Sequence, residues 1–99
     1  MEMKIIKENE VNLELAFIGK LDTNGADVVA HWFYGLLNDI KKDVIIDFTG
    51  VTYLSSAGIR LLLSGWKMAS KQGHKLYLTD PKPDIINLLK MAGLNHFLL

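Results

Sequence analysis

Residues 44–63 read VIIDFTGVTYLSSAGIRLLL, and the fold is decided here. The first five, VIIDF, form a short β-branched run with almost no alternation of apolar and polar positions. Such a run is typical of a strand buried on both faces of a parallel sheet. After the serine pair, the apolar positions change to helical spacing. We therefore expect an inner strand at 44–48 and a helix from about 57 to 72, with Gly73 as the left-handed residue that ends it.

Two strands and a helix are expected before this stretch. Residues 11–18, VNLELAFI, place apolar side chains at every second position, and MKIIK at residues 3–7 is a shorter β candidate across a polar turn. Together they predict an opening hairpin. From residue 28 to 40, apolar side chains recur at steps of three and four, which predicts a helix with one apolar stripe. We expect Asn24 with Asp27 to cap its start.

A strand and a helix are expected after it. KLYLT at residues 75–79 reads as a strand, and residues 80–93 predict a last helix with Pro83 in its first turn and Gly93 at its end. The apolar tail at 94–99 should pack against the core. The order hairpin, helix, strand, helix, strand, helix indicates an α/β fold, in which strands joined through helices run parallel with right-handed crossovers.

The composition narrows the functional classes. The 99 residues, 49% hydrophobic and 22% charged, fit one compact domain. Eleven basic residues balance eleven acidic ones, so no overall positive field favours direct binding to nucleic acid. There is no cysteine, which permits a reducing cytoplasm, the location that we expect. No signal-peptide pattern and no apolar run approaching about 18 residues is present, so we predict a soluble chain without membrane insertion.

Motifs for catalysis or cofactor binding are weak. Neither a Walker loop nor G-x-G-x-x-G occurs, and His31, His74 and His96 are scattered without ligand spacing, so no metal or cofactor is predicted. A serine hydrolase elbow reads G-x-S-x-G, and YLSSAG lacks its first glycine. The hypothesis of a small hydrolase that uses Ser56 is therefore weak, and it ranks third, after the two regulatory and binding functions described below.

Asp47 stands near the carboxyl end of the predicted central strand, where α/β proteins place their sites. A phosphate-accepting aspartate of the receiver type also needs an acidic pair after the first strand and a lysine after a late strand. FIGKLD and YLTDPKP do not supply both. We expect Asp47 to bond the backbone of the FTGV turn that follows it.

Ser55 and Ser56 precede the predicted second helix. Serine is a favoured N-cap, because its oxygen accepts a hydrogen bond from an unpaired N–H of the first turn. The same free N–H groups, with the partial positive charge of the helix start, also favour a phosphate group. A structural cap and a phosphorylation site are compatible here, and the residues alone leave both open.

Residues 47–63, DFTGVTYLSSAGIRLLL, resemble the signature of the STAS family, the bacterial anti-sigma factor antagonists and their relatives. That signature has an acidic residue at the end of the central strand, an S/T-G-V turn, an aromatic and an apolar residue, then D-S-S-G and a leucine-rich helix. GKLDTNGAD at residues 19–27 and LLKMAGLNHFLL at 88–99 resemble two further family segments. The resemblance implies one STAS-like domain over residues 1–99, with a mixed sheet packed against about three to four helices.

The resemblance also implies a function. In the phosphorylated antagonists, the first serine of D-S-S-G is modified by a kinase-like ATPase that is also the anti-sigma factor, and a serine phosphatase resets the cycle. Carried over, the acceptor is Ser56, with Ser55 as second choice. The implied protein is a partner-switching regulator with no catalytic activity of its own. The alternative is a STAS binding subunit of a transport or signalling complex that is not phosphorylated.

The sequence departs from the family pattern at Ser55, where the family usually has aspartate, and at Ala57, where it has the second serine. By resemblance, Asp22 should lie near the phosphorylation site, although a solvated turn carboxylate is an equally good reading. Gly58, without a side chain, should let a partner's backbone approach closely. The residues expected to bind the partner are Asp22, Thr23, Asn24, Ser55, Ser56, Ala57, Gly58 and Ile59.

Overall fold

The computed structural model describes residues 1–98, and within them the strands form one mixed sheet in the order β1-β2-β3-β4. The opening hairpin of β1 and β2 is antiparallel, whereas β2 with β3 and β3 with β4 are parallel. The predicted α/β class and the inner position of the VIIDF strand are confirmed. The strands are β1 (Glu2–Glu8), β2 (Asn12–Leu21), β3 (Asp43–Leu54) and β4 (Leu76–Thr79).

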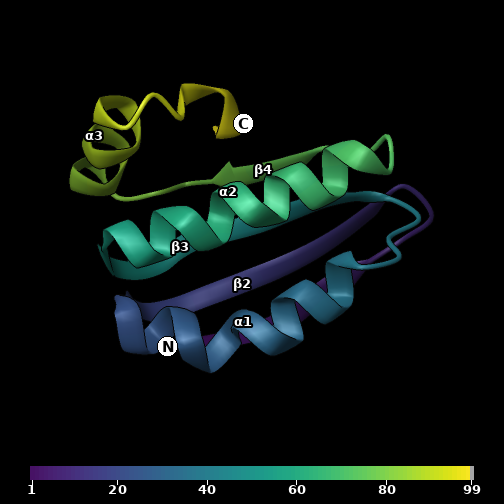
Figure 1. Ribbon diagram of the computed structural model, residues 1–99, viewed down its shortest axis with the longest axis horizontal. Coiled ribbons are helices and arrows are strands. Elements are labelled where there is room, and N and C mark those ends of the chain that lie inside the picture. The colour runs from purple at the N-terminus through teal and green to yellow at the C-terminus, as the bar shows by residue number, and fades with distance from the viewer. Residues whose placement is uncertain (99) are drawn as a thin grey trace.

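Three α-helices and a short 3₁₀ helix complete the described part of the chain. Figure 1 shows α1 and α2 side by side along the sheet, with α3 reached from the end of β4. The chain then returns beside β4, where Leu98 forms a parallel bridge to Leu78. The helices are α1 (Thr23–Leu37), α2 (Ser56–Lys71), α3 (Pro83–Met91) and η1 (Asn95–Phe97).

Three buried phenylalanine rings join the sheet to α1. Phe17 of β2 lies with its ring centroid 5.4 Å from Phe33 of α1 and 6.0 Å from Phe48 of β3. All three side chains are fully buried. On α2, a Cβ added to Gly65 would lie 2.7 Å from the Phe33 ring. The missing side chain at this position therefore lets α2 pack closely against α1.

The central strand is longer and more one-sided than the sequence predicted. Val44, Ile46 and Phe48 are buried, but the alternate side chains Ile45 and Asp47 are only half-buried, so the expectation of burial on both faces was wrong. The FTGV segment was expected as a turn, yet the strand continues through it to Leu54. Its residues keep pairing with β2 across two register shifts, so sheet hydrogen bonding prevails over the local turn signal.

The helix ends also correct one prediction. α1 begins at Thr23, so Asn24 and Asp27 lie inside the helix and Asp22 is the N-cap. Gly73 has a φ of +78°, the left-handed conformation predicted after α2, and Gly93, predicted to end the last helix, has the same conformation with a φ of +76°. In the predicted tail, Phe97 is fully buried, whereas residue 99 lies outside the described residues.

Candidate functional site

The candidate site lies where two neighbouring parallel strands end. β2 leads into α1 and β3 leads into α2, and Leu21 pairs with Leu54 in the last register position. The N–H of Ser55 donates to the carbonyl of Leu21 at 3.0 Å. The two helix starts therefore lie next to each other, at the carboxyl ends of the two inner strands of the sheet. This arrangement brings the DTNG segment (22–25) and the SSAG segment (55–58) together.

Ser55 is the N-cap of α2 and its hydroxyl is fully engaged. Its Oγ accepts a hydrogen bond from the N–H of Gly58 at 3.2 Å. The same Oγ donates to the carbonyl of Leu21 at 3.1 Å. The hydroxyl thus satisfies an unpaired donor of the helix and ties the helix start to the end of β2.

Ser56 is the first residue of α2, and its side chain is exposed. Its hydroxyl makes no hydrogen bond with any residue in the described range 1–98. The two serines therefore have separate roles in this structure. Ser55 provides the cap, and Ser56 presents a free hydroxyl to solvent beside it.

Asp22 caps α1 in the same way. Its Oδ1 accepts a hydrogen bond from the N–H of Gly25 at 2.7 Å. The carboxylate is half-buried and is held by the backbone rather than simply solvated. Thr23 and Asn24 follow on the first turn with exposed side chains. Asp22 therefore has a structural role next to the serine pair.

Gly58 does not lie on the surface as expected. It is buried, and a Cβ added there would lie 2.6 Å from the carbonyl oxygen of Leu21 and 2.9 Å from Cδ1 of Leu54. The absence of a side chain lets α2 pack onto the end of β2, so the idea that it admits a partner's backbone was wrong. The neighbouring Ala57 and Ile59 are half-buried.

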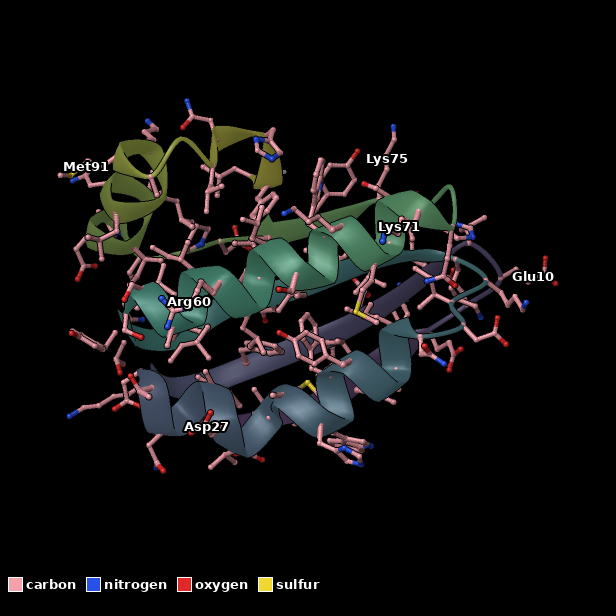
Figure 2. The ribbon with its side chains drawn as sticks, in the orientation of Figure 1. Glu10, Asp27, Arg60, Lys71, Lys75 and Met91 are labelled. Carbon is pink, nitrogen blue, oxygen red and sulfur yellow. The ribbon has the colours of Figure 1, made fainter. Side chains whose placement is uncertain are left out.

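A groove of about 310 Å³ lies between α1, from Thr23 to Tyr34, and the first two turns of α2. Alanine and leucine side chains form much of its lining, and Asp27 of α1 and Arg60 of α2 also line it; Figure 2 shows these two on their neighbouring helices. Sequence reasoning missed Arg60, although its spacing of four residues from Ser56 could have indicated it. The groove is lined by Thr23, Ala26, Asp27, Ala30, Tyr34, Ala57, Arg60 and Leu61.

Asp47 has the local role that the sequence predicted. Its Oδ1 accepts hydrogen bonds from the backbone N–H of Thr49 at 2.9 Å and from the Thr49 hydroxyl at 2.6 Å. The carbonyl of Thr49 in turn accepts a hydrogen bond from Lys82 Nζ at 2.7 Å. These contacts tie Asp47 to the backbone of β3.

His74 and His96 lie apart from the serine pair in the fold. His74 Nδ1 lies 3.3 Å from a carboxylate oxygen of Asp43, at the opposite end of β3, and His96 packs against the Trp66 ring. Within residues 1–98, no group of three or more potential ligands is arranged to hold a metal ion. In the same range, every helix is too short or too polar to cross a membrane.

Known proteins resemble the chain over nearly its whole length. It is 28% identical over 89 residues to the anti-sigma-B factor antagonist of Bacillus subtilis (strain 168), covering 90% of this chain and 81% of that protein. The structure of the anti-sigma factor antagonist SpoIIAA in its unphosphorylated form superposes with a TM-score of 0.85 at 14% sequence identity. The match covers 99% of this chain and 86% of that one. The structure of the Bacillus cell fate determinant SpoIIAA in the phosphorylated form superposes with a TM-score of 0.77 at 14% sequence identity, and the match covers 99% of this chain and 89% of that one.

The family assignment rests on the sequence as well as on the fold. The mixed four-stranded sheet with its three helices matches the fold of SpoIIAA. The family model described as the STAS domain matches residues 3–99, which includes both helix starts and the groove between them. The predicted resemblance is confirmed, and the chain belongs to the STAS domain family.

Proposed function

We propose that this chain is an anti-sigma factor antagonist that works by partner switching, with Ser56 as the phosphorylated residue. The observation that carries the proposal is the division of roles in the serine pair. The Ser55 hydroxyl is engaged by Leu21 and Gly58, whereas the Ser56 hydroxyl is exposed. The likeness to the Bacillus subtilis antagonist supports the same function.

The fold tolerates a phosphate at Ser56. The position is exposed on the first turn of α2, where backbone N–H groups and the helix dipole favour negative charge. Phosphorylation adds a charge of about −2 at pH 7 without removing a cap or a buried contact. The charge therefore changes what the surface binds more than it changes the stability of the domain.

The proposed partner is an anti-sigma factor with serine kinase activity. It binds the unmodified chain, phosphorylates Ser56 with its own ATP and then releases it, and a separate serine phosphatase restores the unmodified form. The chain contributes no catalysis, acts in the cytoplasm, and works as one domain over residues 1–99. The proposed docking surface comprises Asp22, Thr23, Asn24, Ser55, Ser56, Ala57 and Ile59, with Gly58 packed beneath it.

Ser55 in place of the usual aspartate is compatible with this cycle. Serine and aspartate are comparable N-caps, so the hydrogen bond to the Gly58 N–H keeps the helix start in place. The replacement removes one negative charge beside the acceptor. Recognition by the kinase must therefore rely on the remaining docking residues.

Phosphorylation tests the proposal directly. The wild type, Ser56→Ala and Ser55→Ala would each be incubated with the anti-sigma kinase of the same bacterium and Mg-ATP, then scored by intact mass and peptide mapping. We expect wild type and Ser55→Ala to gain one phosphoryl group and Ser56→Ala to gain none. If wild type gains no phosphate, phosphocontrol at Ser56 is wrong.

The alternative is a constitutive STAS binding subunit. Ser55 and Ala57, which replace the acidic residue and the second serine of the family pattern, favour it. This alternative predicts stable partner binding that ATP does not change. The hydrolase hypothesis has less support, because within residues 1–98 no histidine or carboxylate forms a hydrogen bond with Ser56 to act as a base.

A further inference from the structure

Arg60 lies four residues after Ser56 on α2, and both side chains are exposed. Residues four apart on a helix lie on the same side, with Cβ atoms about 6 Å apart. Among the residues that the structure describes, Arg60 forms no salt bridge. A long guanidinium side chain without a partner thus stands one turn from the proposed phosphorylation site.

Resting on the proposed phosphorylation of Ser56, we infer that Arg60 is the internal partner of that phosphate. A guanidinium presents its N–H donors in a planar fork that matches two phosphate oxygens. In the unmodified protein, Arg60 lines the groove between α1 and α2, together with Asp27. Modification therefore both adds a dianion at the docking surface and withdraws a cation from the groove.

The start of α1 provides a comparison within the same molecule. Thr23 is the first residue of α1, as Ser56 is of α2, and both follow directly after the capping residue. Four residues after Thr23 stands Asp27, a carboxylate. A phosphate on Thr23 would thus meet a negative charge where a phosphate on Ser56 meets a positive one.

Other charged groups lie on the elements around this helix start. Lys20 stands at the end of β2, Asp22 is the N-cap of α1, and Asp27 stands on α1. Lys20 is a competing cation, whereas the two carboxylates oppose ionisation of the phosphate. Variants at Lys20 and Arg60 separate the contributions of these two cations.

The test is the second pKa of the phosphate, about 6 for a free phosphoserine. Phosphoserine would be placed at position 56 of the full chain during translation, and its ionisation followed by ³¹P NMR at low salt. Because Arg60 favours the dianion, Arg60→Gln should raise this pKa by about half a pH unit, equivalent to about 0.7 kcal/mol. The Nε–H resonance of Arg60 should shift with the same midpoint in the unsubstituted protein.

Lys67→Gln is the matched control, because it removes the same charge from the same exposed side of α2 but at a position about 16 Å from Ser56 along the helix axis. It should leave the phosphate pKa unchanged, and phosphothreonine at position 23 should titrate at higher pH than phosphoserine at 56. The inference is overturned if Arg60→Gln shifts the pKa no more than Lys67→Gln, or if only Lys20→Gln shifts it. No kinase is involved, so failure here is distinct from failure of the proposed function, which the kinase assay reports.

Discussion

The starts of α1 and α2 have the same local structure. Each has a polar N-cap, a hydroxyl residue at the first helical position and a glycine three residues after the cap, in the segments DTNG (22–25) and SSAG (55–58). In both, the cap oxygen accepts a hydrogen bond from the glycine N–H. Both glycines pack on the end of β2, Gly25 against the carbonyl of Lys20 and Gly58 against that of Leu21.

The two helix starts differ most in charge. The cap of α1 is a carboxylate and that of α2 is a neutral hydroxyl, and the residue four after the first helical position is Asp27 in one and Arg60 in the other. A phosphate is therefore disfavoured at the start of α1 and favoured at the start of α2. The same backbone geometry thus favours the proposed acceptor hydroxyl of Ser56 over the hydroxyl of Thr23.

A negative charge at position 56 should have the largest effect, on partner binding. Ser56→Asp mimics part of the phosphate charge at the centre of the proposed docking surface. Where the bound anti-sigma factor presents acidic residues or ATP phosphates to this position, like-charge juxtaposition costs several kcal/mol, so affinity should fall by about two orders of magnitude, equivalent to about 3 kcal/mol. Isothermal calorimetry of Ser56→Asp and Ser56→Ala would measure the difference.

The control places the same charge elsewhere on α2. Ser64 is exposed and lies about 12 Å farther along the helix, so Ser64→Asp should bind as wild type does. Equal affinity of Ser56→Asp and Ser56→Ala would mean that the docking surface does not include the start of α2.

Substitution of the packed glycines should have the next largest effect, on stability. An added Cβ at either Gly25 or Gly58 meets a backbone carbonyl of β2, which cannot move aside as a side chain can. Overpacking of this kind costs about 1–3 kcal/mol, more than the helix propensity that alanine gains over glycine, up to about 1 kcal/mol. Gly58→Ala and Gly25→Ala should therefore lower the urea midpoint.

Gly35 is the matched control in α1. A Cβ there meets no atom within 4 Å, so only propensity acts and Gly35→Ala should raise stability by up to about 1 kcal/mol. If Gly58→Ala had the same free energy of unfolding as Gly35→Ala, α2 would not pack as closely against the end of β2 as the structure shows.

Hydrophobic periodicity carried most of the fold prediction. The alternation over residues 11–18 and the helical spacing over 28–37 each reflect a buried face, although the apolar side chains of Val11, Val28 and Trp32 are exposed. The extension of β3 through FTGV was not predicted. Glycine and threonine indicate a turn locally, whereas the strand continues because it pairs with β2, which is distant in the sequence.

At the site, residue types were predictable and contacts were not. The serine pair was found from N-cap preference, and the choice of Ser56 as proposed acceptor and the place of Asp22 came from the resemblance. Which serine is the cap depends on where the helix begins, a boundary that propensity does not resolve to one residue. Gly58 was misread because only the fold shows the Leu21 carbonyl opposite it. The relation of Arg60 to Ser56 was available from spacing alone.

Removal of either cap should cost a moderate amount of stability. Asp22→Ala and Ser55→Ala each leave an N–H of the first turn without its partner, at a typical cost of about 1 kcal/mol. The loss should be greater for Asp22→Ala, because its hydrogen bond is shorter, 2.7 Å against 3.2 Å, and its carboxylate also interacts with the helix dipole. Ser55→Asp should retain the stability of wild type. Denaturant titration of the three variants would measure their free energies of unfolding and test this order.

Removal of the hydroxyls at the first helical positions should have the smallest effect. Within residues 1–98, neither Thr23 nor Ser56 uses its hydroxyl in a hydrogen bond, and surface substitutions of this kind usually stay within about 0.5 kcal/mol. Ser56→Ala and Thr23→Ala should therefore unfold at nearly the wild-type urea concentration, whereas Ser55→Ala should not. If instead Ser56→Ala lost as much stability as Ser55→Ala is expected to lose, the helix would start one residue later. Ser56 would then be the cap, and Ser55 would have the free hydroxyl and become the first candidate for phosphorylation.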